Sequence, residues 1–215
     1  MEVNKINRAI VWSIAFLVIH GFLTIISSLL LPQKVVTFIG VVGGIYILIH
    51  AFLIKYNRDW LFINGLLSFV SVICLGVLIG KNLKFEEVIS IGVAISAFDI
   101  LSFTKYGKRT ANAKAMSSIH FMSKLIVYGK GKGDELVPTC GIGDYFYYAI
   151  WISGIQAVSD FIYTYVVGSV LILFGSCIHY FLIIKLSKRD NYKGFPATVF
   201  PFLCISVLYI IIYMK

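Results

Sequence analysis

Acidic residues are few in this chain, and three of them lie in long apolar stretches. The sequence has 10 Asp and Glu residues among 215, of which Asp99, Asp144 and Asp160 fall within or at the ends of hydrophobic segments. An ionised carboxylate in such a segment is costly, so each acid there is a hypothesis for a functional site. Two carboxyl groups that share a proton can hydrolyse an amide, because the ionised one deprotonates a water while the protonated one donates to the carbonyl oxygen. This chemistry requires no metal or other cofactor.

The spacing of the first two acids predicts that they lie at similar depth. Asp99 precedes Lys105 by six residues, which places it roughly 9 Å inside the end of its segment if that segment is helical. Asp144 lies about one turn into the next apolar segment, which begins from the same side. If these consecutive antiparallel helices pack about 8–10 Å apart, both carboxyls can reach one water. Asp160 lies roughly 24 Å further along and is expected at a solvated helix end.

The composition predicts the elements that must carry these acids. The chain is 59% hydrophobic and 13% charged, with a mean hydropathy of +0.90, whereas a soluble domain has about 25% charged residues. A water-surrounded globule is therefore excluded, and we expect an all-α, polytopic bundle in the cell membrane. About seven segments have close to the 20 apolar residues that a span requires: 9–31, 35–54, 60–80, 87–104, 141–163, 166–186 and 195–214. The fifth and sixth are expected to be joined by a tight turn at Thr164 and Tyr165.

The net charge of +9 is explained by the orientation of the chain in the membrane. An N-terminus in the cytoplasm leaves most of the 19 Lys and Arg residues on the inner side, with Lys34, Lys81, Lys84 and Lys215 outside. The positive-inside rule therefore predicts an N-in, C-out topology, and no nucleic-acid partner is needed to explain the charge. We divide the chain into a three-span scaffold (1–86) and a four-span region (87–215) that holds the paired acids.

Small residues and one long connection complete the expected architecture. Gly40 with Gly44 and Gly76 with Gly80 have the four-residue spacing that lets helices approach closely in lipid. The connection over 105–140 contains two short apolar runs, 125–128 and 136–140, around the sequence GKGKGD. This pattern predicts a short β-hairpin at the membrane surface, with Pro138 at an edge or a bulge.

Two further motifs lie near the acids in the sequence. Gly141 and Gly143 precede Asp144 and would let the backbone adopt unusual angles or approach an extended peptide closely. Pro196 and Pro201 lie at the start of the last apolar segment. On their own, these residues are explained by helix capping and kinking.

The combination of these motifs resembles the presenilin and signal-peptide-peptidase family of intramembrane aspartyl proteases. That family has a YD motif in one span, GxGD in the next and PAL at the head of the last. The corresponding residues here are Phe98-Asp99, Gly141-Ile142-Gly143-Asp144 and Pro196-Ala197-Thr198. The match runs from about residue 87 to the C-terminus, and it is the order and spacing of the motifs that make it specific.

The resemblance implies cleavage of transmembrane protein or peptide substrates by water, with Asp99 and Asp144 as the catalytic dyad. The residues expected to bind substrate are Gly141, Ile142, Gly143, Pro196, Ala197 and Thr198. Family members use strands beside the second Asp helix to hold an unwound substrate, which agrees with the predicted hairpin. The chain departs from the family in having seven rather than nine expected spans, Phe98 in place of Tyr, and Thr198 in place of Leu.

Two other functions remain as alternatives. Prepilin and preflagellin peptidases also carry GxGD, but nothing here resembles the region of their first Asp. A proton-coupled transporter would also use intramembrane acids, although it predicts inverted repeats and acids in mid-bilayer. The histidines form no HExxH metal motif, and His20, His50 and His179 are expected to be packed polar groups.

Overall fold

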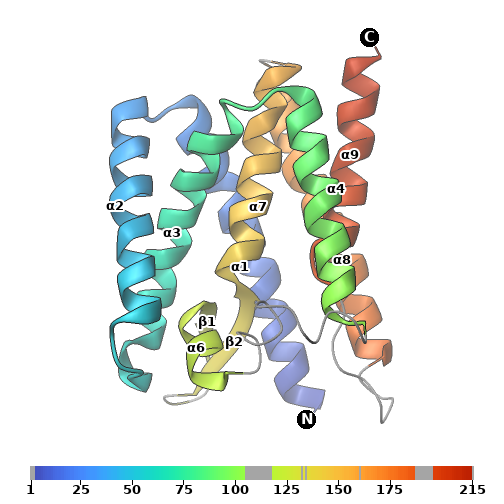
Figure 1. Ribbon diagram of the computed structural model, residues 1–215. Helices are drawn as coiled ribbons and strands as arrows, with labels where there is room; N and C mark the ends of the chain where they lie inside the picture. Colours follow the sequence, from blue (N-terminus) through green and yellow to red (C-terminus); the bar gives the residue numbers. More distant parts are fainter. Residues whose placement is uncertain are drawn as a thin grey trace.

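Helices make up most of the computed structural model, which describes residues 3–104, 118–131, 133, 135–159, 161–186 and 196–214 (Figure 1). The longer helices are α1 (Val3–Leu29), α2 (Gln33–Phe52), α3 (Leu61–Gly80), α4 (Phe85–Ser102), α7 (Ile142–Ser153), α8 (Ile162–Leu186) and α9 (Val199–Tyr213). Shorter elements are α6 (Ile119–Lys124), the 3-10 turns η1 (Arg58–Trp60) and η3 (Gly154–Ala157), and the strands β1 (Ile126–Lys130) and β2 (Leu136–Gly141). Asp160 and residues 105–117 lie outside the described residues.

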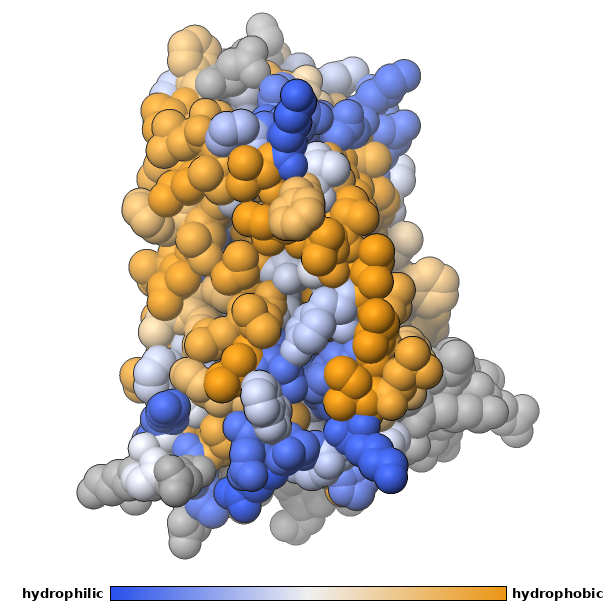
Figure 2. Space-filling model, turned by 90° about the vertical axis from the view of Figure 1, so that its left-hand side faces the viewer, coloured by the Kyte–Doolittle hydropathy of each residue, from blue (hydrophilic) through white to orange (hydrophobic). Residues whose placement is uncertain are grey.

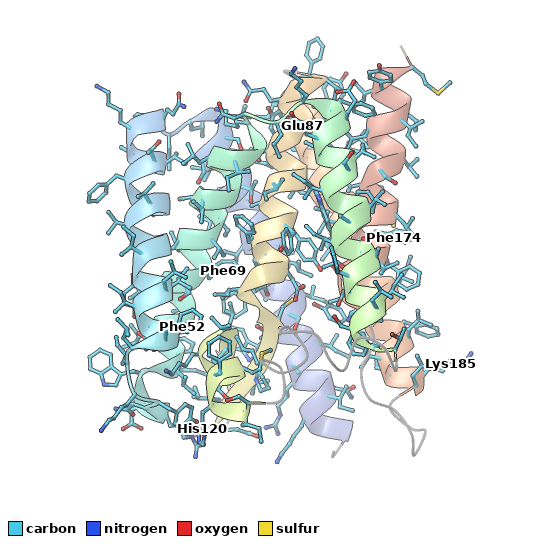
Figure 3. All side chains as sticks on the ribbon, in the orientation of Figure 1. Phe52, Phe69, Glu87, His120, Phe174 and Lys185 are labelled. Atoms are coloured by element: carbon cyan, nitrogen blue, oxygen red, sulfur yellow. The ribbon has the colours of Figure 1, made fainter. Side chains whose placement is uncertain are left out.

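Four helical segments are long and apolar enough to cross a membrane, counted over the part of the chain that the structure describes. They are Lys5–Leu29, Gln33–Phe52, Arg58–Gly80 and Ile162–Leu186, and α9 is a shorter apolar helix. Large apolar side chains such as Phe174 lie exposed on the outside of the bundle, whereas Phe69 is buried within it (Figure 3). The mostly helical architecture and its membrane-like surface therefore agree with the sequence analysis.

Two predicted boundaries are wrong. The turn expected at Thr164 and Tyr165 lies inside α8, and the break in the chain instead follows α7, which ends at Ser153 and continues as η3. The sequence contains Gln156, Ser159 and Asp160 at this break, but the long apolar runs on both sides kept the average hydropathy high enough to predict one span. The last helix begins at Val199 rather than at 195, so Pro196 precedes the helix and only Pro201 lies in its first turn.

The centre of the bundle is α7, which packs against α1, α3, α8 and α9 (Figure 1). Its side chains Tyr145 and Trp151 are fully buried. The predicted small-residue stripe on α3 faces α7, where a Cβ on Gly76 would lie 2.7 Å from the carbonyl oxygen of Phe146. The glycines therefore permit close helix packing, and one continuous core joins the segments before and after residue 86.

The predicted β-hairpin is confirmed. Strands β1 and β2 are antiparallel, Tyr128 is opposite Pro138, and the register is irregular between Ile126 and Tyr128. Pro138 is tolerated because a two-stranded sheet leaves each strand with a free edge. In the connecting turn Gly133 has a φ of 65°, which favours glycine.

Side chains of α1 attach the hairpin to the bundle, and a side chain of α6 attaches the segment just before it. The Trp12 indole N–H of α1 donates to the Lys130 carbonyl oxygen over 2.9 Å, and Arg8 pairs with Glu135. The Lys124 ammonium of α6 donates to the Ala51 carbonyl oxygen at the end of α2 over 3.1 Å. The hairpin and the N-terminal end of α1 lie at one end of the bundle, opposite the C-terminus (Figure 1).

Candidate functional site

The second acid, Asp144, is positioned by the junction between strand and helix. Strand β2 runs directly into α7, Gly141 is the N-cap in an extended conformation, and Asp144 lies in the first turn. The Ile142 N–H donates to the Leu125 carbonyl oxygen over 2.9 Å, and the Cys140 thiol donates to Asp144 Oδ2 over 3.0 Å. The position of Asp144 is therefore set by the hairpin together with the most buried helix of the bundle.

The first acid, Asp99, lies on a peripheral helix. The buried residues of α4 are Val88, Gly92 and Ser96, and Asp99 itself is partly buried three residues before the helix ends. Its carboxyl group accepts two hydrogen bonds on Oδ2 from Thr198, one from the backbone N–H over 3.1 Å and one from the hydroxyl over 2.8 Å. Thr198, at the head of α9, thus holds Asp99 in place.

Two buried side chains, one from α7 and one from α8, bind the backbone of the Pro196–Thr198 segment. The Tyr148 hydroxyl of α7 donates to the Ala197 carbonyl oxygen over 3.3 Å, and the His179 ring of α8 hydrogen-bonds the backbone of Pro196. Thr198 is only 3% exposed. The segment that holds Asp99 is therefore itself attached to the helix that carries Asp144.

Both acids border one hollow of about 560 Å³, a size within the usual range for ligand pockets. Of the predicted substrate-binding residues, Gly141, Ile142, Gly143 and Thr198 line it, whereas Pro196 and Ala197 do not. The remaining lining residues are Ile95, Phe98, Phe121, Met122, Leu125 and Tyr147, most of them apolar. Two carboxyls facing a largely apolar hollow can bind a water beside an apolar substrate.

Comparison with protein-family models and with curated proteins found no similar protein. No protein-family model matches the chain, and no curated protein is significantly similar to it in sequence. The two acids and the groups that hold them are therefore the features that bear on function.

Sequence reasoning missed three residues of the site: Cys140, Tyr148 and His179. Cys140 and Tyr148 each lie four residues from Asp144 in the sequence, and that helical spacing is a usable signal for Tyr148. His179 had no comparable signal, because α8 and the segment before α9 come together only in the folded chain. Thr198 was expected at the site, but its two bonds to Asp99 were not.

Proposed function

We propose that this protein is an intramembrane-cleaving aspartyl protease that uses Asp99 and Asp144 to hydrolyse peptide bonds of transmembrane substrate helices. The observation that carries this proposal is that two carboxyls from separate helices border the same largely apolar hollow. The motifs around them resemble those of presenilin-like proteases, and Thr198 contacts Asp99 from the segment that corresponds to that family's Pro-Ala motif.

The proposal includes seven membrane-crossing helices in an N-in, C-out arrangement. The opposite positions of the N-terminal end of α1 and the C-terminus support this topology (Figure 1). The hollow is then reached near the inner face, where α4 ends and α7 begins. Hydrolysis requires water, and water can enter from that face without crossing the hydrocarbon core.

The hydrogen bonds suggest different roles for the two acids. Thr198 donates two hydrogen bonds to Oδ2 of Asp99, which orients that carboxyl group, and we assign Asp99 as the base that takes a proton from the attacking water. Asp144 is the acid, and since the Cys140 thiol donates to Oδ2, Oδ1 is the oxygen that carries the proton. The water oxygen bonds to the amide carbon while Asp144 protonates the carbonyl oxygen, giving a tetrahedral diol.

Collapse of the diol completes the reaction. Asp99 returns its proton to the amide nitrogen as the C–N bond breaks, and Asp144 recovers a proton from a diol hydroxyl. All atoms are accounted for, and both acids return to their starting states. Strand β2, which is continuous with α7, lies where an unwound substrate strand could pair beside the dyad.

Cleavage of a transmembrane test substrate in liposomes tests the proposal. We expect the wild type to cleave it, and Asp99→Asn and Asp144→Asn each to lower the rate by at least about 10³-fold. Asp59→Asn is the matched control, because Asp59 is an exposed acid in η1 outside the hollow. Comparable thermal unfolding of all variants excludes misfolding. Cleavage that survives either substitution at full rate rules out the dyad.

A further inference from the structure

A second hollow, separate from the acids, lies between the end of α2 and the start of α3. It has a volume of about 830 Å³ and shares no lining residue with the hollow that holds Asp99 and Asp144. Its lining combines polar, cationic, aromatic and apolar side chains: Tyr46, His50, Ile54, Lys55, Tyr56, Asn57, Arg58, Trp60, Ile63, Asn64 and Leu67. We refer to it as the α2–α3 cleft.

A hydrogen-bonded polar network forms the inner wall of the cleft. The Tyr46 hydroxyl donates to Asn64 Oδ1, and the Asn64 amide nitrogen lies 2.7 Å from His50 Nε2. The rings of Tyr46 and His50 stack with their centroids 5.9 Å apart. Asn64 is 7% exposed and His50 is 5% exposed, so these groups are held in place at the base of the cleft.

Two cations lie at the rim of the cleft. Lys55 and Arg58 are exposed, and among the described residues neither forms an ion pair. Tyr56 and Trp60 line the same cleft and are 40% and 58% exposed. Exposed Trp and Tyr with Lys and Arg are typical of the headgroup region of a membrane.

The cleft interrupts an otherwise apolar face. Figure 2 shows hydrophilic residues extending upward from the lower end of the molecule between hydrophobic surfaces. The exposed apolar side chains Ile63 and Leu67 are part of the lining. Tyr46 precedes the last residue of α2, Phe52, by six residues, so the network extends roughly 9 Å into the bundle from that end of the helix.

We propose that the α2–α3 cleft binds one anionic glycerophospholipid. The phosphate lies between Lys55 and Arg58, the glycerol ester region meets the Tyr46–Asn64–His50 network, and an acyl chain runs along Ile63 and Leu67. Hydrocarbon alone cannot satisfy the polar wall, and cations near the inner leaflet attract anionic lipid. Inorganic phosphate matches only the rim, whereas a phospholipid matches the rim, the network and the apolar wall together.

Native mass spectrometry tests this inference independently of proteolysis. The purified protein is reconstituted with equal amounts of phosphatidylglycerol and phosphatidylcholine, extracted in mild detergent, and the retained lipids are counted. We expect phosphatidylglycerol to be retained about tenfold in excess, and Lys55→Gln/Arg58→Gln to remove most of that preference. Lys5→Gln/Lys185→Gln is the matched control, since it removes the same charge outside the cleft. Lys185 lies at the same lower end of the molecule (Figure 3).

A second variant tests the polar wall. Tyr46→Phe keeps the ring but removes the hydroxyl, and we expect retention of phosphatidylglycerol to fall several-fold while thermal unfolding without lipid changes little. Equal retention of the two lipids by the wild type, or an equal loss in both double variants, overturns the inference. Inorganic phosphate that stabilises the lipid-free protein as much as phosphatidylglycerol does would instead make the rim a free-phosphate site and overturn the lipid assignment.

Discussion

The two helices that carry the acids differ in how they are held. Helix α7 runs through the centre of the bundle, and its side chains Tyr145 and Trp151 are fully buried. Helix α4 has six more residues than α7 but buries only three, and it packs mainly against α9, with smaller contacts to α7 and η3. The proposed dyad therefore combines one acid fixed by the core with one that is positioned through a few contacts at the edge.

If the protein is the proposed protease, this difference predicts where a substrate enters and which contacts control activity. On the proposed function, a transmembrane substrate would reach the hollow past α4, because only three residues of that helix are buried. Asp99 is held by two hydrogen bonds from Thr198 at the head of α9, and the proposed mechanism requires this position. Disturbing α7 should therefore affect folding, and disturbing α4 should affect mainly cleavage.

The largest expected effect on stability lies at the contact between α3 and α7. A Cβ on Gly80 would lie 2.6 Å from the Ile150 carbonyl oxygen, and backbone cannot move aside easily. We expect Gly80→Val to lower the free energy of unfolding by about 3 kcal/mol, measured by denaturant unfolding in detergent. Gly44→Ala is the control, because its Cβ would make ordinary contact with Leu75 at 3.5 Å. Equal losses in both variants would contradict the central role of α7.

The bond between Thr198 and Asp99 should affect catalysis more than folding. Thr198→Val removes the hydroxyl donor but keeps the shape and the backbone N–H, and we expect kcat to fall about 30-fold with KM nearly unchanged. Thr198→Ser keeps the donor and should stay within about threefold of the wild type. A Val variant as active as the Ser variant would show that the hydroxyl plays no part.

The packing of α4 on α9 can be weakened without changing either acid. A Cβ on Gly92 would collide with the ring of Phe202, a side chain that can rotate away. We expect Gly92→Ala to lower the free energy of unfolding by only about 1 kcal/mol. Cleavage should nevertheless fall about tenfold, because Asp99 moves relative to Thr198. Val93→Ala is the control, since Val93 is 55% exposed on the same helix; an equal loss of cleavage there would contradict the account of α4.

The smallest expected effect is at the ion pair between α1 and the hairpin. Arg8 Nη1 lies 3.0 Å from Glu135 Oε2, and the two side chains are 40% and 35% exposed. Because an exposed ion pair contributes little, Arg8→Gln should lower the free energy of unfolding by about 0.5 kcal/mol at most. The difference from the wild type should shrink further in about 0.5 M salt. A loss comparable to that of Gly80→Val would mean that the hairpin is central to the fold.

Local patterns allowed much of the fold to be predicted, whereas contacts between distant segments were not accessible. The glycines around Lys130 and Lys132 predicted the hairpin, and GxGD predicted Asp144 at a helix start. The end of α7 at Ser153 was missed because the few polar residues that follow it, Gln156, Ser159 and Asp160, were averaged with the apolar residues around them. The bonds from Thr198 to Asp99 join residues far apart in the chain, and Asn64 and His50 meet only because α2 and α3 pack side by side.

Binding of a tetrahedral-intermediate mimic tests the central claim most directly, because it does not depend on turnover. Such a peptide carries a hydroxyl-bearing carbon in place of the scissile amide, so that both carboxyls must engage the same hydroxyl. We expect the wild type to bind it at least about 10²-fold more tightly than the matching unmodified peptide. This preference should be lost in both Asp99→Asn and Asp144→Asn. A preference that survives in either variant would contradict a shared dyad.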